Sequence, residues 1–375
     1  MDVSAADLAS SGDDRPPFRA DHVGSLLRPP ELLDLRARVR RGEASPAQLR
    51  VAEDKAIREA VTFQESLGLE SVTDGEFRRE SFHGSFIDKI EGAEFRPHDP
   101  SRGGADKMPF VAVVSGKLRR PADGIEVENF RFLLSVASRT AKQTMPSPTM
   151  MHFRGGRAAI DRHAYPHLED FFADLARIYR EEVHALAAAG CRYLQLDDTN
   201  LAYLCDERLR EAARARGEDV ERLPSTYVEL INESIRGRPS ELAVCVHLCR
   251  GNARSQWFAS GGYEPIAEMV FNGLEVDGFF LEYDDERSGD FTPLRFVPRG
   301  KKVVLGLITT KRGELEDADA VLRRVDEAAR YVPLERLCLS PQCGFASAAD
   351  GNLLSVDDQR RKLALVVELA ERIWG

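Results

Sequence analysis

The chain has 375 residues, of which 43% are hydrophobic and 30% charged, a composition typical of globular rather than disordered proteins. Lysine and arginine total 52 against 62 aspartates and glutamates, and the net charge of −10 disfavours nucleic acid or an anionic membrane as a partner. No apolar run approaches the ~20 residues that span a bilayer, and the polar N-terminus lacks the apolar core of a secretory signal. We therefore expect a cytoplasmic protein that binds neither nucleic acid nor membrane.

Short apolar runs alternate with longer amphipathic stretches along the chain. Residues 1–17, which end in Pro16-Pro17, are expected to form a disordered leader. The short runs after it end near Val23, Thr73, Met151, Leu196, Leu248, Leu281, Ile308 and Ser340. Helical patterns, several with a Ser or Asp cap at the start and Gly at the end, cover 45–68, 167–190, 263–274, 317–332 and 355–374.

This alternation predicts an α/β protein, namely a single (β/α)₈ TIM barrel over residues 18–375. A doubly wound open sheet is the alternative fold. The stretch from about 91 to 142 is more strand-like and does not fit a plain strand–helix unit. We expect it to be a β-rich insertion after the second unit that covers the barrel or contacts a second subunit of a homodimer.

Polar side chains stand where the expected strands end, which is the end of a barrel that carries its chemistry. Seven of the eight strands have an ionisable, thiol or hydroxyl group there: Ser25, Asp74, Glu76, Asp197, Asp198, His247, Cys249, Glu282, Asp284, Lys311 and Cys343. Any one of them would serve equally as a helix cap or a solvated loop residue, and for Asp74 and Asp284 the two interpretations are balanced. The coincidence across seven strands indicates an enzyme.

His247 and Cys249 are two residues apart on an expected strand, so their side chains lie on the same face. Imidazole and thiolate both bind Zn²⁺, and Cys343 and Glu282 at other strand ends would complete the set. The alternative is a core thiol at Cys343 and a hydrogen-bonded buried imidazole at His247. Cys245, two residues before His247, would lie on the same face of the strand. It is deeper in the strand, which favours Cys249 as the ligand.

A zinc ion with two thiolate ligands suits one reaction better than another. The two thiolates neutralise the Zn²⁺ charge, which makes it a poor activator of water and a good holder of a substrate thiolate. If such a thiolate replaced the carboxylate of Glu282, the net charge of the site would not change. The residues therefore favour attack of a thiol on an alkyl carbon over hydrolysis.

The chain resembles a known family in an ordered set of segments: FRADHVGSLLRP, GLESVTDGEFRRESF, YLQLDDTNLAYL, VHLCRGN, FFLEYDDERSG, VVLGLITTK and LSPQCGFAS. They are similar to the C-terminal catalytic half of cobalamin-independent methionine synthase, and most of all to its short single-barrel members. The resemblance implies four zinc ligands, His247, Cys249, Glu282 and Cys343. It also implies that Ser25 meets the substrate carboxylate while Glu76 and Asp197 hold its ammonium group.

The acidic pair supports an amine-bearing substrate independently. Two carboxylates in one barrel mouth are costly unless a cation joins them, and an amino-acid thiol such as homocysteine supplies that cation. The alternatives are a turn cap for Asp197 and a salt bridge to Arg78 or Arg79 for Glu76.

The sequence departs from the family on the side that would face the methyl donor. Thr309-Thr310-Lys311 stands where the long synthases carry a histidine after the seventh strand, and Met151-His152-Phe153 stands in place of a Trp-Ser pair. We expect no second, N-terminal barrel of the kind that the long synthases carry. The resemblance therefore leaves the alkyl donor open: a folate, a methylcorrinoid protein, a simpler methyl compound or an epoxide.

Three functions follow from these residues. The first is methyl transfer to homocysteine. The second resembles the epoxyalkane:coenzyme M transferases, in which Lys311 would protonate the alkoxide and Arg250 or Arg78 would bind the sulfonate. The third is a non-enzymatic zinc- or thiol-binding barrel. The acidic pair favours homocysteine.

Lys311 and Asp198 are the candidate catalytic residues. Asp198, His22 and His152 also lie near expected strand ends. Each would either hold a residue of the site in position or have a purely structural role.

Overall fold

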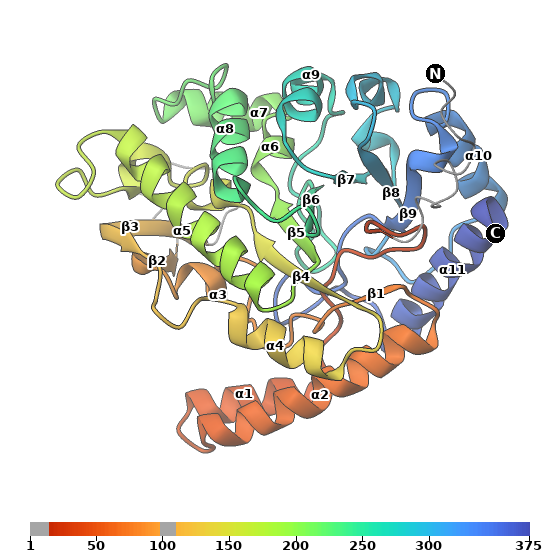
Figure 1. Ribbon diagram of the computed structural model, residues 1–375, viewed down its shortest axis with the longest axis horizontal. Helices are drawn as coiled ribbons and strands as arrows, with labels where there is room; N and C mark the ends of the chain where they lie inside the picture. Colours follow the sequence, from red (N-terminus) through yellow and green to blue (C-terminus); the bar gives the residue numbers. More distant parts are fainter. Residues whose placement is uncertain (1–14, 98–109) are drawn as a thin grey trace, which may run out of the picture.

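The structure is a computed structural model that describes residues 15–97 and 110–375. Its main feature is one curled sheet of parallel strands in chain order, a half-barrel with helices on its outer side (Figure 1). The seven strands are β1 (Ser71–Val72), β4 (Thr140–Pro146), β5 (Tyr193–Asp198), β6 (Ala243–Leu248), β7 (Gly278–Glu282), β8 (Lys302–Ile308) and β9 (Leu337–Pro341). Because the strand order does not reverse, the doubly wound alternative is wrong.

The segment 19–26 takes the place of the eighth strand. Ala20 forms a parallel bridge with Leu339 of β9, where the Asp21 amide donates to the Leu339 carbonyl at 3.0 Å. At its other end, the Leu26 amide donates to the Gly75 carbonyl just beyond β1 at 3.1 Å. The segment thus lies between the two edge strands of the sheet, and the predicted TIM-barrel class is confirmed.

The helices follow the strands and cover the outer face of the sheet. They are α1 (Pro30–Arg40), α2 (Pro46–Ser66), α3 (Gly84–Ile87), α4 (Val127–Val136), α5 (Leu168–Ala188), α6 (Asn200–Tyr203), α7 (Glu207–Ala215), α8 (Leu223–Ile235), α9 (Glu264–Gly273), α10 (Ala318–Ala328) and α11 (Val356–Trp374). Ser45 and Ser355 form capping boxes at α2 and α11, and the Asp317 side chain caps α10. These caps are among those that the sequence predicted.

The predicted insertion is partly correct. β2 (Glu91–Pro97) and β3 (Phe110–Arg119) pair antiparallel as a separate two-stranded sheet, and residues 98–109 between them lie outside the described residues. The rest of the stretch was misassigned, because residues 127–136 form helix α4 and β4 begins at Thr140. The aromatic and β-branched residues there suggested strands, but Val127, Phe130 and Leu133 are buried at the three-residue spacing of one helical face.

Only the last three residues of the predicted leader, residues 1–17, are described by the structure. Residues 1–14 lie outside the described residues, whereas Arg15–Pro17 contact the body of the protein. The Lys302 ammonium donates to the carbonyls of Arg15 and Pro17, both at 2.9 Å, and the Pro17 side chain is buried.

Side chains on the inner face of the sheet form layers. The lower layer is an apolar cluster of Phe18, Val23, Tyr193, Ala243, Cys245, Phe280, Val304 and Cys338. Two residues further along their strands, Gln195, His247 and Glu282 face the same side. The polar residues at the strand ends therefore stand on an apolar floor, and Cys245 belongs to that floor.

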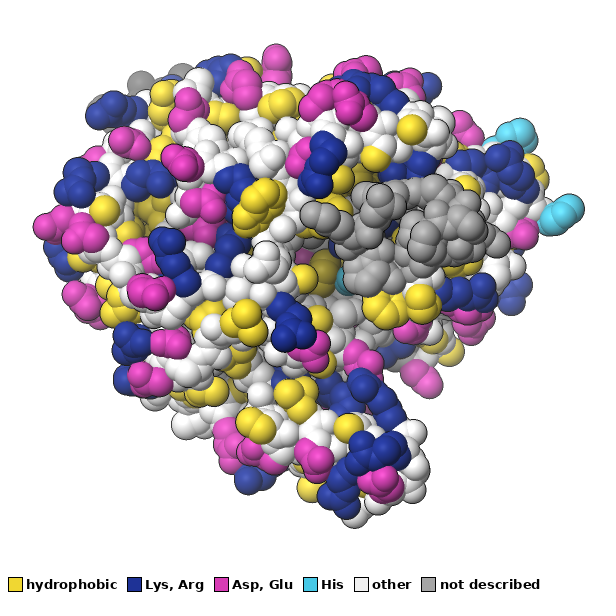
Figure 2. All heavy atoms as spheres, turned by 180° about the vertical axis from the view of Figure 1, so that it is seen from behind, with side chains coloured by type: hydrophobic (Ala, Val, Ile, Leu, Met, Phe, Trp, Pro, Cys, Tyr) yellow, Lys and Arg dark blue, Asp and Glu magenta, His cyan; other side chains and the backbone are white. Residues whose placement is uncertain are grey.

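Figure 2 shows acidic and basic side chains interspersed over one face of the molecule. None of the described helices is long and apolar enough to cross a membrane.

Candidate active site

His247, Cys249 and Cys343 lie together at the carboxyl ends of β6 and β9. One ligand atom from each lies within 4.8 Å of the others, and the two sulfurs are 3.5 Å apart. All three side chains are buried, and both ring nitrogens of His247 lack a hydrogen-bond partner in the described part of the chain. Two sulfurs and one imidazole are a donor set that zinc accepts, and an unsatisfied buried imidazole is costly without a ligand, so these residues fit a metal ion.

The three side chains also perturb one another. The neighbouring Cys343 thiol and burial raise the pKa of the Cys249 thiol well above its ordinary value. Burial lowers the pKa of His247, but Cys249, Asp197 and Glu282 outweigh that effect and raise it overall. The Cys249 thiol, 3.5 Å from the Cys343 sulfur, is therefore uncharged until a cation draws off its proton.

Glu282, the expected fourth ligand, is held beside this cluster by cations. Its Oε1 accepts from Arg287 at 2.7 Å and from Lys311 at 3.2 Å, and its Oε2 accepts from the Arg250 amide at 2.6 Å. Burial raises the pKa of Glu282, but these cations outweigh it and lower the pKa to about 2. The carboxylate is ionised and fixed in place, outside the three-residue group whose ligand atoms converge.

Lys311 joins Glu282 to Asp284. Its ammonium donates to Asp284 Oδ2 at 2.7 Å as well as to Glu282. Burial lowers the pKa of Lys311, but the two carboxylates raise it above its ordinary value. The lysine therefore holds its proton firmly.

Glu76 and Asp197 face the same interior space from the loop after β1 and the end of β5. Glu76 Oε1 accepts from the Thr144 hydroxyl at 2.8 Å and lies 3.4 Å from Arg79, whereas its Oε2 is buried without a partner among the described residues. Asp197 Oδ1 accepts from Gln195 at 2.6 Å. Burial raises the pKa of both carboxyls, that of Asp197 to about 7, and the charge of Glu76 contributes to the rise at Asp197.

The backbone that presents Glu76 is unusual. Its φ is 60°, in the left-handed region that non-glycine residues rarely adopt, and Asp74 Oδ1 accepts the Glu76 amide at 2.8 Å. The predicted alternative of a salt bridge to Arg79 is present, but it occupies only one carboxylate oxygen. The other oxygen remains available to a cation.

Ser25 lies next to the cysteine loop. Its Oγ accepts from the Ala346 amide at 3.3 Å, and a Cβ added to Gly344 would come within 2.0 Å of it. The glycine after Cys343 therefore allows the hydroxyl to approach the loop backbone, at a distance that no other residue type would permit.

Two predicted site residues are committed elsewhere. Asp198 accepts from the Thr149 hydroxyl at 2.6 Å and from the Leu201 amide at 2.8 Å, because adjacent residues of a strand point to opposite faces and Asp197 takes the inner one. Every nitrogen of the Arg250 guanidinium already donates to the protein, to Gly261, Tyr263, Glu282 and Ser288. Asp198 thus accepts a hydrogen bond from the first turn of α6, and the buried Arg250 side chain links the loops after β6 and β7 through its hydrogen bonds.

Arg78 also points away from the mouth. It donates to Asp54 at 2.5 Å and to Asn129 at 3.0 Å, between α2 and α4.

The two histidines with open roles lie in separate networks. His22 is buried beside Asp21 and the Lys142 ammonium, which donates to Asp21 at 3.1 Å, and its Nε2 lies 3.3 Å from the Ser71 carbonyl. His152 Nδ1 lies 2.9 Å from the Tyr227 hydroxyl. Neither lies in the cluster of His247, Cys249 and Cys343.

Sequence reasoning missed two residues that complete the site. Gln195 orients Asp197, and its position two residues earlier on the same strand was the available signal. Arg287 holds Glu282 through the short helix η4 (Glu286–Ser288), and nothing in its DERSG context distinguishes it from a solvated arginine.

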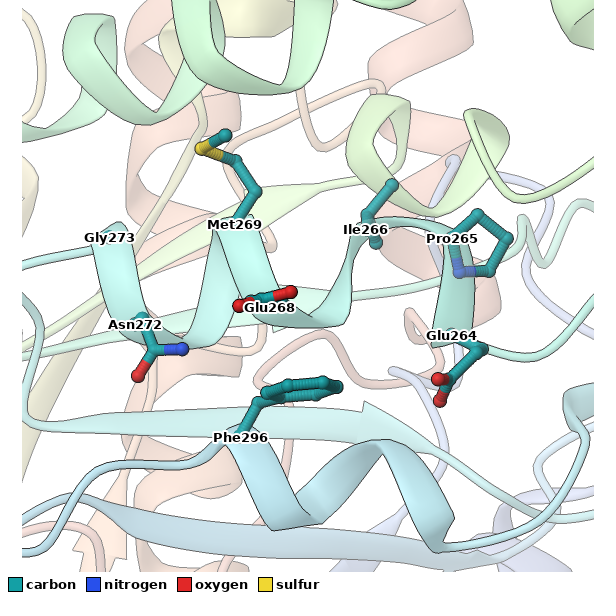
Figure 3. A pocket seen from close by; sticks show the side chains of 8 residues that line it. All are labelled: Glu264, Pro265, Ile266, Glu268, Met269, Asn272, Gly273 and Phe296. Atoms are coloured by element: carbon teal, nitrogen blue, oxygen red, sulfur yellow. The ribbon is translucent and has the colours of Figure 1, made fainter.

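A surface pocket of about 600 Å³ lies elsewhere. It is lined by α9 and by Phe296 of the short helix η5 (Thr292–Phe296), and it contains none of the predicted site residues (Figure 3).

Comparisons with known proteins identify the family of the chain. Residues 18–372 match the family described as "Cobalamin-independent synthase, Catalytic domain". The uncharacterized Bacillus subtilis protein YxjH is 46% identical over 365 residues, covering 96% of this chain and 95% of its own. A methionine synthase from Pyrococcus abyssi is 25% identical over 86% of this chain and 85% of its own length.

A solved structure shares the whole fold. It is a Listeria monocytogenes protein grouped with the vitamin-B12-independent methionine synthases, with a TM-score of 0.78 and 40% identity over 96% of this chain and 99% of that one. The resemblance inferred from the motifs is thereby confirmed. The chain belongs to the cobalamin-independent synthase family, whose members are methionine synthase-like methyltransferases.

Proposed function

We propose that this protein transfers a methyl group to the sulfur of homocysteine, giving methionine, with Zn²⁺ held by His247, Cys249 and Cys343. The observation that carries the proposal is the position of the acidic pair next to that cluster. Asp197 and His247 are register partners on β5 and β6, so a substrate sulfur at the cluster lies close to the carboxylates.

Each end of homocysteine would have its own partner. The open Oε2 of Glu76 and the Asp197 carboxylate bind the ammonium, whose positive charge would offset the burial that raises the pKa of both carboxyls. The Ser25 hydroxyl donates to the substrate carboxylate, as the family resemblance implies. A bound Zn²⁺ would lower the pKa of the substrate thiol so that it reacts as a thiolate at neutral pH.

The transfer itself is a displacement at carbon. A bond forms between the homocysteine sulfur and the methyl carbon as the bond from that carbon to the donor breaks, and the donor keeps the electron pair. Lys311 and Arg287 hold Glu282 beside the reacting sulfur, which makes them positioning residues in this scheme. The reacting sulfur would stand above the apolar floor of the sheet.

The relatives support the same reaction, since the Pyrococcus abyssi protein of similar length is named a methionine synthase. The epoxide alternative has less support. Arg250 and Arg78, the two arginines expected to bind a sulfonate, both donate to protein acceptors instead. We therefore keep homocysteine as the thiol.

The test is a paired activity assay on zinc-loaded protein. One arm measures methionine formation from homocysteine with methyltetrahydrofolate, methylcobalamin or a simpler methyl compound, and the other measures epoxide loss with coenzyme M. We expect methionine in the first arm and none from a Cys249→Ser variant. Epoxide consumption with coenzyme M and no methionine from any donor would overturn the proposal.

A further inference from the structure

A second group of polar residues lies over the mouth of the sheet, apart from the metal-binding cluster and the acidic pair. Arg154 comes from the loop after β4, His83 from the loop after β1, and Tyr203 ends α6 after β5. Loops that follow parallel strands of a barrel meet over the same end of it. Arg154 and His83 are in contact there, with Nη1 of the arginine 3.1 Å from Nε2 of the histidine.

This contact fixes the proton on His83. A guanidinium only donates hydrogen bonds, so Nε2 must accept and the ring hydrogen must be on Nδ1. Burial, reinforced by the Arg154 charge, holds the pKa of His83 well below its ordinary value, and the ring stays neutral. The imidazole is 94% buried between the rings of Phe82 and Phe95, at centroid distances of 4.3 and 4.5 Å.

Both side chains therefore present donors that the protein does not use. Nε of Arg154 and Nδ1 of His83 are buried and have no hydrogen-bond partner among residues 15–97 and 110–375. No ion pair joins Arg154 to a carboxylate in this described part of the chain, in contrast to Arg79, which is 3.4 Å from Glu76. A half-buried cation beside unused donors is costly unless an anion reaches it.

A single side chain, Tyr203, lies between the Arg154 guanidinium and the sulfur of Cys249. Arg154 lies beside the phenol of Tyr203, where burial raises the pKa of the phenol and the arginine charge opposes the rise. The Tyr203 hydroxyl packs 3.4 Å from the point where a Cβ on Gly251 would be, and the Gly251 amide donates to Cys249 Sγ at 3.2 Å. A ligand that extends from Cys249 past Tyr203 therefore reaches Arg154.

We propose that Arg154, with His83, binds an anionic group of the alkyl donor, and hence that the donor carries a carboxylate, a sulfonate or a phosphate. Tyr203 separates this anion site from the cysteine sulfurs, so the anionic group is the part of the donor remote from the reacting carbon. The identification of the ligand as the donor rests on the proposed function. The anion site itself rests only on the contacts of Arg154 and His83.

The first experiment measures anion binding without turnover. Equilibrium dialysis of the zinc-loaded protein with inorganic phosphate, and separately with glutarate, compares the wild type with Arg154→Met and Arg154→Lys. Arg162→Met is the matched control, because Arg162 is an exposed arginine eight positions further along the same loop. We expect Arg154→Met to bind at least one of these anions about tenfold or more weakly, since a charge-assisted hydrogen bond is lost, and Arg162→Met to bind as the wild type does.

Zinc content and homocysteine affinity report whether each variant folds. Both should match the wild type in Arg154→Met, and Arg154→Lys should retain part of the anion affinity because it keeps the charge but not the planar fork. Undiminished anion binding by Arg154→Met, or no binding of either anion by the wild type, would overturn the anion site.

The second experiment separates the site from the proposed reaction. With a donor that yields methionine, Arg154→Met should raise the KM for an anionic donor about tenfold and leave the KM for homocysteine unchanged. An equal rise in both KM values would overturn the role in donor binding. If the wild type makes no methionine but binds an anion that Arg154→Met does not bind, the methyl transfer is contradicted and the anion site is upheld.

Discussion

Replacing Glu76 by glutamine tests the acidic pair directly. The change removes one negative charge and keeps the shape of the side chain, including an oxygen that can accept from Thr144. An ammonium on the open Oε2 would make a charge-assisted hydrogen bond, which contributes about 1.5–3 kcal/mol. At about 1.4 kcal/mol per factor of ten, homocysteine should bind roughly 10- to 100-fold more weakly to Glu76→Gln.

Calorimetry on zinc-loaded protein measures this without knowledge of the donor. The comparison thiol is 4-mercaptobutanoate, which has the chain and carboxylate of homocysteine but no amine, and its affinity should change by less than about twofold. Glu80→Gln is the matched control, since Glu80 is exposed and four positions further along the same loop. An equal loss for both thiols, or no loss for homocysteine, would refute the assignment of Glu76 to the ammonium.

Three further predictions concern the metal and the buried charges. Cys343→Ser should weaken zinc binding by at least about tenfold, as measured by competition with a chelator, whereas Cys245→Ser should not, because that thiol belongs to the apolar floor. Lys142→Met leaves Asp21 buried and unpaired and should lower the free energy of unfolding by about 3–5 kcal/mol in urea, with much of the loss recovered by adding Asp21→Asn. Burial, with Lys142, lowers the pKa of His22 to about 4, so only the unfolded chain gains this proton between pH 6.5 and 4. Lowering the pH through that window should therefore decrease the free energy of unfolding by up to about 1.4 kcal/mol per pH unit for this residue. In urea titrations at several pH values, His22→Gln should show a correspondingly weaker dependence of stability on pH.

Five helices could be predicted to within a few residues, and most strand ends as well, but the strand predicted to end near Met151 ends at Pro146. Parallel strands buried on both faces read as short apolar runs, and the polar residue that ends each run marks the mouth, as at Leu248-Cys249 and Leu281-Glu282. Helix α4 was missed because Phe130 and Leu133 pack into the core from a segment rich in residues that favour strands. Burial on a single face distinguishes the two only once the packing partners are known.

The alternation of side chains along a strand predicts which of them share a face, but not which residues from other segments hydrogen-bond to them. Alternation placed His247 and Cys249 on one face and would have separated Asp197 from Asp198. It could not show that Arg287 and Lys311 hold Glu282, since both arrive from loops whose paths depend on the whole fold. Arg250 illustrates the same limit, because only the buried carbonyls around it reveal that its donors are occupied.

The contact between segment 19–26 and β9 bears on when the protein can acquire its metal. Arg19 donates to the Leu337 carbonyl across 318 positions, so the sheet closes only after nearly all of the chain has been synthesised. Cys249 precedes Cys343 by 94 positions, and at about 5–20 residues per second the ribosome exposes the first thiol roughly 5–20 s before the second. During that interval the nascent chain offers at most two of the three ligands. We therefore expect metal to be captured by the completed barrel, with metallation as the final step of its maturation.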